Sequence, residues 1–377
     1  MDYDTLALDL HKQHGGKITT RLRDTDELDK TKLSAYYTPG VAAVSKAIAD
    51  DPEKLRDYTW THNLVAVISD GSAVLGLGNI GPRGSMPVME GKSLLFKHFA
   101  DIDSVPIILD VHTPDEIVAT IKAIAPSFGA INLEDIASPQ CFEIEERLKA
   151  ELPIPVFHDD QHGTAVVTLA GLINATKITG RSLQDSKIVV VGAGAAGTAI
   201  IKLLRHYGAS RVLAVDSHGI VSRNRTDLND AKRLLLEHVD ADTDGSLEDA
   251  LTGADIFIGV SQPGVLTPEL IAKMANDPIV FALANPTPEI MPDVARQAGV
   301  AVIATGRSDF PNQVNNAIAF PGIFRGALDN NVRMITDEHK IAAAEVIANL
   351  VQNPSPELII PSPFDERIVP AVADVIR

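Results

Sequence analysis

Short apolar runs alternate with segments of helical spacing from residue 64 onward, a pattern typical of α/β proteins with parallel sheets. Runs rich in Val, Ile and Leu predict strands at 64–69, 105–109, 130–133, 154–157, 187–191, 211–215, 256–260, 279–283 and 300–303. Helical spacing predicts helices that include 114–124, 142–152 and 163–178. Residues 1–60 are polar and charge-rich, with helical stretches interrupted by glycine and proline.

A glycine-rich turn in the second half has the context of a dinucleotide site. Gly192-Ala193-Gly194-Ala195-Ala196-Gly197 follows a predicted strand and opens into a helix, and the next strand ends at Asp216. Such glycines let backbone N–H groups approach a pyrophosphate, and a carboxylate in this position can bind the ribose hydroxyls. We expect NAD⁺, with NADP⁺ less favoured by roughly a hundredfold or more because Asp216 repels its 2′-phosphate. Arg223 and Arg225 follow closely and could fold back to weaken that preference.

An earlier turn, Gly76–Gly81, has the same glycine spacing in a different context. Pro82 follows it directly and Pro87 comes soon after, so no helix is expected to continue from this turn. The turn reads as a loop that leaves a strand. Asp70-Gly71 before it and Lys92 after it suggest a polar, functional surface.

These patterns predict two domains in the 377-residue chain. Residues 1–162 are expected to form an N-terminal α/β domain with a mainly parallel sheet, and residues 163–377 a C-terminal Rossmann-type dinucleotide-binding domain. The polar stretch 180–186 is the expected hinge region.

Two acidic pairs follow strands of the first half. Glu134-Asp135 comes after the strand at 130–133, and Asp159-Asp160 after the strand at 154–157. Because ligands bind beyond the carboxyl ends of parallel strands, the pairs could converge on a cation, and oxygen ligands suit Mg²⁺ or Mn²⁺. Each pair could instead cap the following helix. His158 and His162 invite a zinc interpretation, but no third ligand in register is obvious.

Asparagine-rich segments follow the later strands. Asn285-Pro286 comes after the strand at 279–283, and Asn315-Asn316 precedes an apolar stretch. They could be ordinary turn formers, or they could bind a carboxamide or a substrate carboxylate beside the dinucleotide site.

Charge and composition exclude several classes of partner. The formal net charge of −17 argues against nucleic acid and anionic membranes as partners. No apolar run reaches the ~18 residues that a membrane helix needs, and the acidic N-terminus is unlike a signal peptide. The single cysteine, Cys141, excludes an intrachain disulfide and reads as a packing residue. We therefore expect a cytoplasmic protein.

An ordered set of motifs resembles the short bacterial malic enzymes along nearly the whole chain. The set comprises Tyr37-Thr38-Pro39-Gly40-Val41-Ala42, Asp70-Gly71, Gly76–Gly81 with Lys92, Glu134-Asp135, His158–Thr164, Gly192–Gly197, Ala284-Asn285-Pro286-Thr287 and Asn315-Asn316. The resemblance implies oxidative decarboxylation of (S)-malate to pyruvate and CO₂ by a homodimer, with NAD⁺ or NADP⁺ and a divalent cation.

The resemblance also implies roles for individual residues. Lys92 would be the general base toward the malate C2 hydroxyl, with a nearby metal helping to lower its pKa and with Asp159 as a proton relay. Tyr37 would protonate the enolate at C3. The metal ligands would be Glu134, Asp135 and Asp160, and contacts to substrate or coenzyme would come from Asn285, Asn315 and Asn316.

This chain also departs from the family pattern. Longer malic enzymes carry an arginine that binds a malate carboxylate where this chain has Ala73. This chain must use backbone donors or another cation instead, with Lys17, Arg21 and Arg83 as candidates. No fumarate-type allosteric site is expected, because the additional length is absent. The main alternative is a metal-dependent oxaloacetate decarboxylase on the same scaffold. A nucleotide-sensing regulator would be expected to lose the metal carboxylates or Lys92, and a plain 2-hydroxy-acid dehydrogenase normally has no metal cluster.

Overall fold

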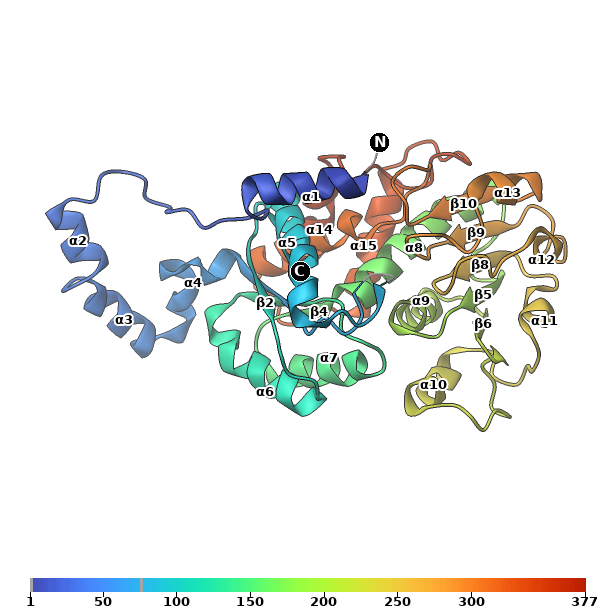
Figure 1. Ribbon diagram of the computed structural model, residues 1–377, viewed down its shortest axis with the longest axis horizontal. Helices are drawn as coiled ribbons and strands as arrows, with labels where there is room; N and C mark the ends of the chain where they lie inside the picture. The colour runs from blue at the N-terminus through green and yellow to red at the C-terminus, as the bar shows by residue number, and fades with distance from the viewer. Residues whose placement is uncertain (1–2, 75–76) are drawn as a thin grey trace.

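The computed structural model describes residues 3–74 and 77–377, and its strands form two sheets (Figure 1). The first sheet has the order β2-β1-β3-β4 and is parallel throughout. Its strands are β1 (Leu64–Ser69), β2 (Asp103–Ile108), β3 (Ala130–Leu133) and β4 (Val156–His158). Gly76 of the first glycine turn lies outside the described residues.

The second sheet has the order β10-β9-β8-β5-β6-β7, with only β7 antiparallel. Its strands are β5 (Lys187–Val191), β6 (Arg211–Asp216), β7 (Gly219–Ile220), β8 (Ile256–Gly259), β9 (Ile279–Ala282) and β10 (Val302–Thr305). Because β6 and β8 lie on opposite sides of β5, the strand order reverses at the end of β5, where such sheets bind nucleotides. The predicted α/β fold class is confirmed.

The α-helices of the described residues precede, connect and follow these strands. They are α1 (Tyr3–His14), α2 (Lys30–Tyr36), α3 (Val41–Asp50), α4 (Leu55–Tyr58), α5 (Gly81–Ala100), α6 (Pro114–Ile124), α7 (Gln140–Glu151), α8 (Asp159–Thr179), α9 (Ala195–His206), α10 (Asp230–Leu235), α11 (Leu247–Leu251), α12 (Pro268–Ile271), α13 (Pro292–Gln297), α14 (Phe320–Asp329), α15 (Asp337–Asn349) and α16 (Ile368–Asp374). No helix of the described residues is both long and apolar enough to cross a membrane.

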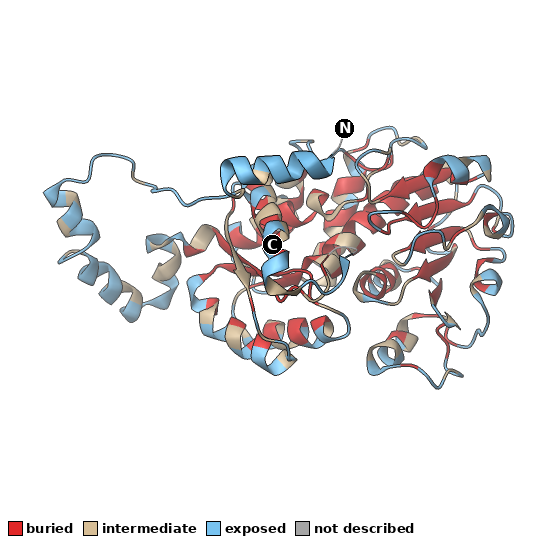
Figure 2. Cartoon of the chain, in the orientation of Figure 1, coloured by how far each residue is buried: buried red, intermediate tan, exposed pale blue. Residues whose placement is uncertain are grey.

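Helix α8 joins the two halves and is buried on nearly all sides (Figure 2). Side chains around it belong to one apolar cluster that includes Val65 of the first sheet and Ile188 of the second. A helix that is apolar all round needs such an enclosed position. The expected domain boundary between residues 162 and 163 falls within the first turns of this helix, which begins four residues earlier than the predicted helix at 163–178.

The prediction that no helix follows the first glycine turn is wrong. Helix α5 begins at Gly81, with Pro82 in its first turn and Pro87 inside it. Proline is favoured in the first turn, because its missing N–H would have no partner there. Pro87 removes one internal hydrogen bond, yet the helix continues through Lys92. The position of Lys92 therefore depends on a helix that the two prolines had argued against in the sequence.

Residues 20–58, here called the N-terminal arm, extend away from the body of the molecule (Figure 1). None of the residues in α2, α3 and α4 is buried (Figure 2). Large apolar side chains along the arm remain exposed, among them Leu22 at 82% and Leu28 at 65%.

Candidate active site

Lys92 is buried, and its ammonium group contacts two carboxylates. Nζ lies 2.6 Å from Asp159 Oδ2 and 2.8 Å from Glu134 Oε1. It also lies 4.4 Å from the ring centroid of Phe320, a distance at which the ring face attracts a cation. Helix α5, the end of β3 and the first residues of α8 and α14 therefore meet at one point. Lys92 is therefore not a solvated surface lysine.

The surrounding charges determine the protonation of this cluster. Burial by itself lowers the pKa of Lys92, but the carboxylates of Asp159 and Glu134 outweigh it and raise the pKa above its ordinary value. Burial raises the pKa of Asp159 to about 6, with Lys92 acting in the opposite direction. The lysine is therefore a protonated donor here, and the expected lowering of its pKa depends on a bound metal that the chain alone does not supply.

The two acidic pairs lie together at the edge shared by β3 and β4. The backbone N–H of Asp135 donates to Asp160 Oδ2 at 2.7 Å, and Asp135 adopts a left-handed backbone conformation with φ of 53°. Asn132 Nδ2 donates to Glu134 Oε2 at 2.8 Å. Backbone geometry and a buried amide thus orient the carboxylates.

The donor set suits a hard cation, although the described residues contain no three His, Cys, Asp or Glu side chains already arranged as a metal site. The acidic pairs bring four carboxylates to one edge of the sheet, two of which contact the ammonium group of Lys92, and Oδ1 of the fully buried Asp159 has no hydrogen-bond partner. Oxygen ligands and excess negative charge fit Mg²⁺ or Mn²⁺. The zinc interpretation gains no support, because His162 Nε2 lies 2.8 Å from Glu145 Oε2.

Gly163 brings Asn316 against the carboxylate cluster. A Cβ atom at Gly163 would lie 2.8 Å from Asp159 Cγ and 3.0 Å from Asn316 Cβ, so only glycine leaves room for both. Asn315 Oδ1 instead accepts the N–H of Ala317 at 2.9 Å and caps the short 3₁₀ helix η6 (Asn316–Ile318). Of the two predicted asparagines, Asn316 is the one beside Asp159.

The second glycine turn has the geometry expected of a dinucleotide site. Gly192 has a φ of 112°, and a Cβ there would lie 2.5 Å from Val260 O. A Cβ at Gly197 would overlap the carbonyl oxygen of Gly192, whereas Gly194 has open space beside it and precedes the first turn of α9. Asn285 is exposed beside Gly306, beyond the ends of β9 and β10.

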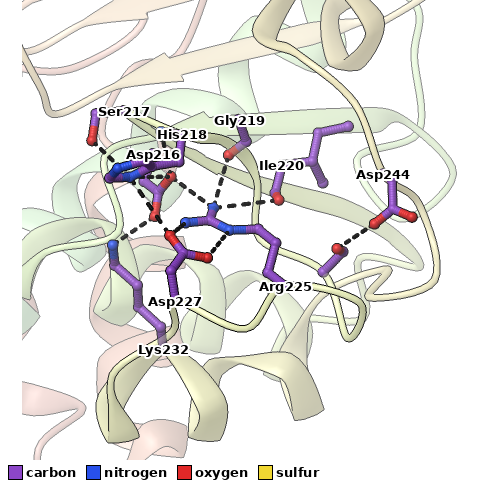
Figure 3. A network of polar contacts seen from close by, with 10 residues as sticks. Asp216, Ser217, His218, Gly219, Ile220, Arg225, Asp227, Lys232 and Asp244 are labelled. Atoms are coloured by element: carbon purple, nitrogen blue, oxygen red, sulfur yellow. Dashed lines mark hydrogen bonds and ion pairs between the residues drawn. The ribbon is translucent and has the colours of Figure 1, made fainter.

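Asp216 is enclosed in a network of polar contacts rather than left bare (Figure 3). Its carboxylate receives Arg225 Nη1 at 2.7 Å, Lys232 Nζ at 2.6 Å and the backbone N–H of His218 at 2.8 Å. Arg225 therefore folds back, as the sequence allowed. Lys232 was missed because it lies on α10, too far along the chain for local spacing to reveal it.

The structure does not bring Tyr37 to the carboxylate cluster of its own chain. Tyr37 is 69% exposed and ends α2 in the N-terminal arm. Ala73, in contrast, lies at the site, since its N–H donates to Asp135 O at 3.0 Å. Of the possible substitutes for the missing arginine, Arg83 is exposed in the first turn of α5, and Lys17 Nζ donates to Pro87 O at 2.6 Å.

A buried carboxylate that sequence reasoning overlooked supports the loop before α8. Glu145 Oε1 accepts the backbone N–H of His158 at 3.0 Å and lies 2.6 Å from Lys149 Nζ. Burial would raise the pKa of Glu145, but His162 and Lys149 hold it well below its usual value. Its place among Cys141, Ile144 and Leu148 on the buried face of α7 was the available signal.

Two cavities border these elements without containing Lys92. One, of about 650 Å³, lies between α7, α8, α9 and the start of α15, beside Glu145 and His162. The other, of about 920 Å³, lies at the C-terminal end of α5 against α14 and α16. Neither cavity is lined by Lys92, whose ammonium group is buried against Asp159 and Glu134.

Known protein families and individual relatives match nearly the whole chain. The family "Malic enzyme, N-terminal domain" matches residues 17–149, and "Malic enzyme, NAD binding domain" matches residues 161–373. The chain is 54% identical over 374 residues to the bifunctional malic/malolactic enzyme of Bacillus subtilis, covering 98% of this chain and 91% of that protein. It is 47% identical over 390 residues to the NADP-dependent malic enzyme of Halomonas elongata, covering 98% and 92%. The crystal structure of the NAD-dependent malic enzyme from Thermotoga maritima superposes with a TM-score of 0.95 at 51% identity, over 98% of each chain.

Proposed function

The chain belongs to the malic enzyme family, and we infer that it oxidises (S)-malate and decarboxylates it to pyruvate and CO₂ with a nicotinamide dinucleotide. The observation that supports this most strongly is the buried contact of Lys92 with Asp159 and Glu134. A nucleotide-binding regulator would have no use for a lysine buried against two carboxylates, because burying charged groups costs free energy and such clusters are typical of catalytic sites.

Glu134, Asp135 and Asp160 are the residues that would hold Mg²⁺ or Mn²⁺. When bound, the cation polarises the C2 oxygen of malate and stabilises negative charge that develops there. The excess of carboxylates over the single ammonium group of Lys92 supports this assignment. Asn316, packed beside Asp159, and Asn285, beyond β9, would contact substrate and the nicotinamide ribose.

Lys92 would accept the proton of the malate C2 hydroxyl while the hydride of C2 passes to the nicotinamide. The lysine must first lose its own proton, and Asp159 Oδ2 at 2.6 Å is placed to receive it. Burial raises the pKa of Asp159 to about 6, which makes it a better proton acceptor than an ordinary aspartate.

This assignment is tested by malate-dependent NADH formation in Lys92→Ala and in the matched variant Lys97→Ala. Lys97 lies on the same helix, is 54% exposed and pairs with Asp101 and Asp103. We expect the loss of a general base to reduce turnover by ~10²-fold or more in the first variant and to leave the second near the parent. NADH formation by Lys92→Ala at the parent rate would remove Lys92 from the chemistry. An oxaloacetate decarboxylase would form no NADH from malate at all.

Tyr37 would protonate C3 of the enolate, and its exposed position supports a homodimer in which the N-terminal arm of one copy reaches the site of the other. The arm buries none of its helical residues against its own chain, and it exposes Leu22, Leu28 and Tyr36. A two-fold dimer would cover these side chains and complete both sites at once.

Complementation between two inactive variants distinguishes shared from separate sites. Lys92→Ala and Tyr37→Phe are mixed in equal amounts under conditions that exchange subunits. If Tyr37 acts across the dimer, about a quarter of the parent activity returns, because half of the dimers are mixed and each holds one intact site. If Tyr37 acts within its own chain, both sites of a mixed dimer are defective and no activity returns.

We propose NAD⁺ as the favoured coenzyme, with NADP⁺ accepted less well. Asp216 at the end of β6 stands where a carboxylate binds the adenosine ribose. The size of the preference depends on the cations around Asp216. The lone Cys141, buried as a thiol, fits a reducing compartment, and we propose that the enzyme works in the cytoplasm.

A further inference from the structure

A buried carboxylate joins the two loops that follow β8 and β9. Glu289 is fully buried. Its Oε1 accepts the backbone N–H of Ser261 at 2.8 Å, and its Oε2 accepts the backbone N–H of Ala284 at 3.0 Å. Ser261 Oγ lies a further 3.3 Å from Oε1. Each oxygen of this one carboxylate therefore holds a different loop.

The two N–H groups are those that the strands leave without a partner. Val260 and Leu283, directly after β8 and β9, still donate to neighbouring strands. Ser261 and Ala284 are the next residues of the two loops, and they donate to Glu289 instead. A buried backbone N–H without an acceptor costs free energy, so the carboxylate satisfies both groups and fixes the spacing of the loops at the same time.

Gly259, the last residue of β8, makes room for this carboxylate. A Cβ atom at Gly259 would lie 2.4 Å from Glu289 Cδ. Burial raises the pKa of Glu289, and the N–H groups of Ser261 and Ala284 act in the opposite direction. Glycine weakens a strand, and burying a carboxylate costs free energy as well. The chain therefore maintains this arrangement against two unfavourable effects.

Both loops lie on the nicotinamide side of the dinucleotide site. Asp216 ends β6 on one side of β5, whereas β8 and β9 lie on the other side, where the second half of a dinucleotide binds (Figure 1). The first loop backs the glycine turn, because a Cβ at Gly192 would lie 2.5 Å from Val260 O. In the second loop Ala284 precedes Asn285, which would contact the nicotinamide ribose. This placement rests on the proposed use of a nicotinamide dinucleotide.

We propose that Glu289 is a positioning residue that holds the loops of Ser261 and Ala284 together and thereby sets the affinity of the enzyme for the nicotinamide half of its coenzyme. Without the carboxylate the loops separate, and Asn285 loses its place beside the nicotinamide ribose. The adenosine half, bound beside Asp216 across β5, keeps its contacts.

The test compares Glu289→Gln with Glu269→Gln, which removes the same charge from an exposed residue in the first turn of α12. A glutamine has one acceptor oxygen and one NH₂ group, so it can accept an N–H from only one of the two loops. Dissociation constants are measured without malate for NADH and for 5′-AMP, which probes the adenosine half alone. Thermal unfolding midpoints are measured in parallel.

Glu289→Gln should raise the Kd of NADH about tenfold or more and the Kd of 5′-AMP less than about twofold. Glu269→Gln should bind both ligands like the parent. A merely structural role would lower the unfolding midpoint of Glu289→Gln and weaken both ligands equally or neither, and that result overturns the proposal.

Gly259→Ala is a second variant, which displaces the carboxylate without removing it. If Glu289→Gln does not fold, Gly259→Ala decides. A weaker affinity for NADH with parent affinity for 5′-AMP then supports the proposal, and parent affinity for both overturns it.

These binding measurements separate the proposal from the proposed reaction. If the parent binds NADH but does not oxidise malate, the proposed function fails and the selective loss of NADH affinity still supports the role of Glu289. If the parent oxidises malate and both variants bind NADH as the parent does, the role of Glu289 fails alone.

Discussion

Replacement of Gly163 by alanine should disable the site although it introduces a better helix former. Gly163 lies within α8, one turn after Asp159. An added Cβ would stand 2.8 Å from Asp159 Cγ, whereas carbon atoms pack at about 3.5–4.0 Å. On its other side it would stand 3.0 Å from Asn316 Cβ, so neither neighbour can move without disturbing the site.

The magnitude follows from two opposing effects. Alanine stabilises a helix interior by about 0.5–1 kcal/mol relative to glycine. Displacing the carboxylate of Asp159 separates it from Lys92, and breaking a buried ion pair costs about 3–5 kcal/mol. The net effect is a loss of roughly 2–4 kcal/mol, and turnover should fall ~10²-fold or more because the proton relay is misplaced.

Gly91→Ala is the matched control. Gly91 lies on α5 beside Lys92, and a Cβ there meets only Lys17 Nζ, at an ordinary 3.7 Å. This variant should be as stable as the parent or slightly more so, with unchanged turnover. Thermal unfolding and malate-dependent NADH formation are measured for both variants. The reasoning is refuted if Gly163→Ala unfolds no earlier than Gly91→Ala and keeps comparable activity.

Other consequences are tested separately. Asp160→Asn should raise the Mn²⁺ concentration needed for half-maximal activity by more than ~10-fold and leave NADH binding unchanged, and an unaltered Mn²⁺ requirement would contradict the ligand role. Tyr37→Phe should slow deuterium exchange into C3 of pyruvate in heavy water, and exchange at the parent rate would remove its role as general acid. Glu145→Gln should lower the thermal midpoint by leaving Lys149 without a charged partner, and an unshifted midpoint would contradict that. Burial raises the pKa of Cys141 to about 12, so iodoacetamide at pH 8 should label the thiol only after unfolding.

The parts of the fold that could be predicted from the sequence are those with a local sequence pattern. Strands β1, β3 and β5 lie at their predicted positions, because continuous apolar runs bounded by turn residues indicate buried parallel strands. The same logic located the Gly192 turn, since its strand, glycines and helix are contiguous. At α5 the same reasoning gave a wrong prediction, because Pro82 and Pro87 suggested that no helix forms there. Helix packing outweighed the one missing hydrogen bond.

Features that depend on tertiary contacts could not be predicted from the sequence. Nothing next to Lys92 in the sequence indicates its burial, which arises because α5, β3, α8 and α14 converge. The partnership of Lys232 with Asp216 joins a strand to a helix, and the contact of Glu145 with the loop before α8 joins two helices. The position of Tyr37 on an extended arm has no local signature either.

The central claim is tested most directly by measuring NADH, pyruvate and CO₂ in one reaction of the enzyme with (S)-malate, NAD⁺ and Mn²⁺. The account predicts equal amounts of the three products, and none of them when EDTA removes the metal. Release of CO₂ without NADH, lactate in place of pyruvate, or full turnover in EDTA would contradict it.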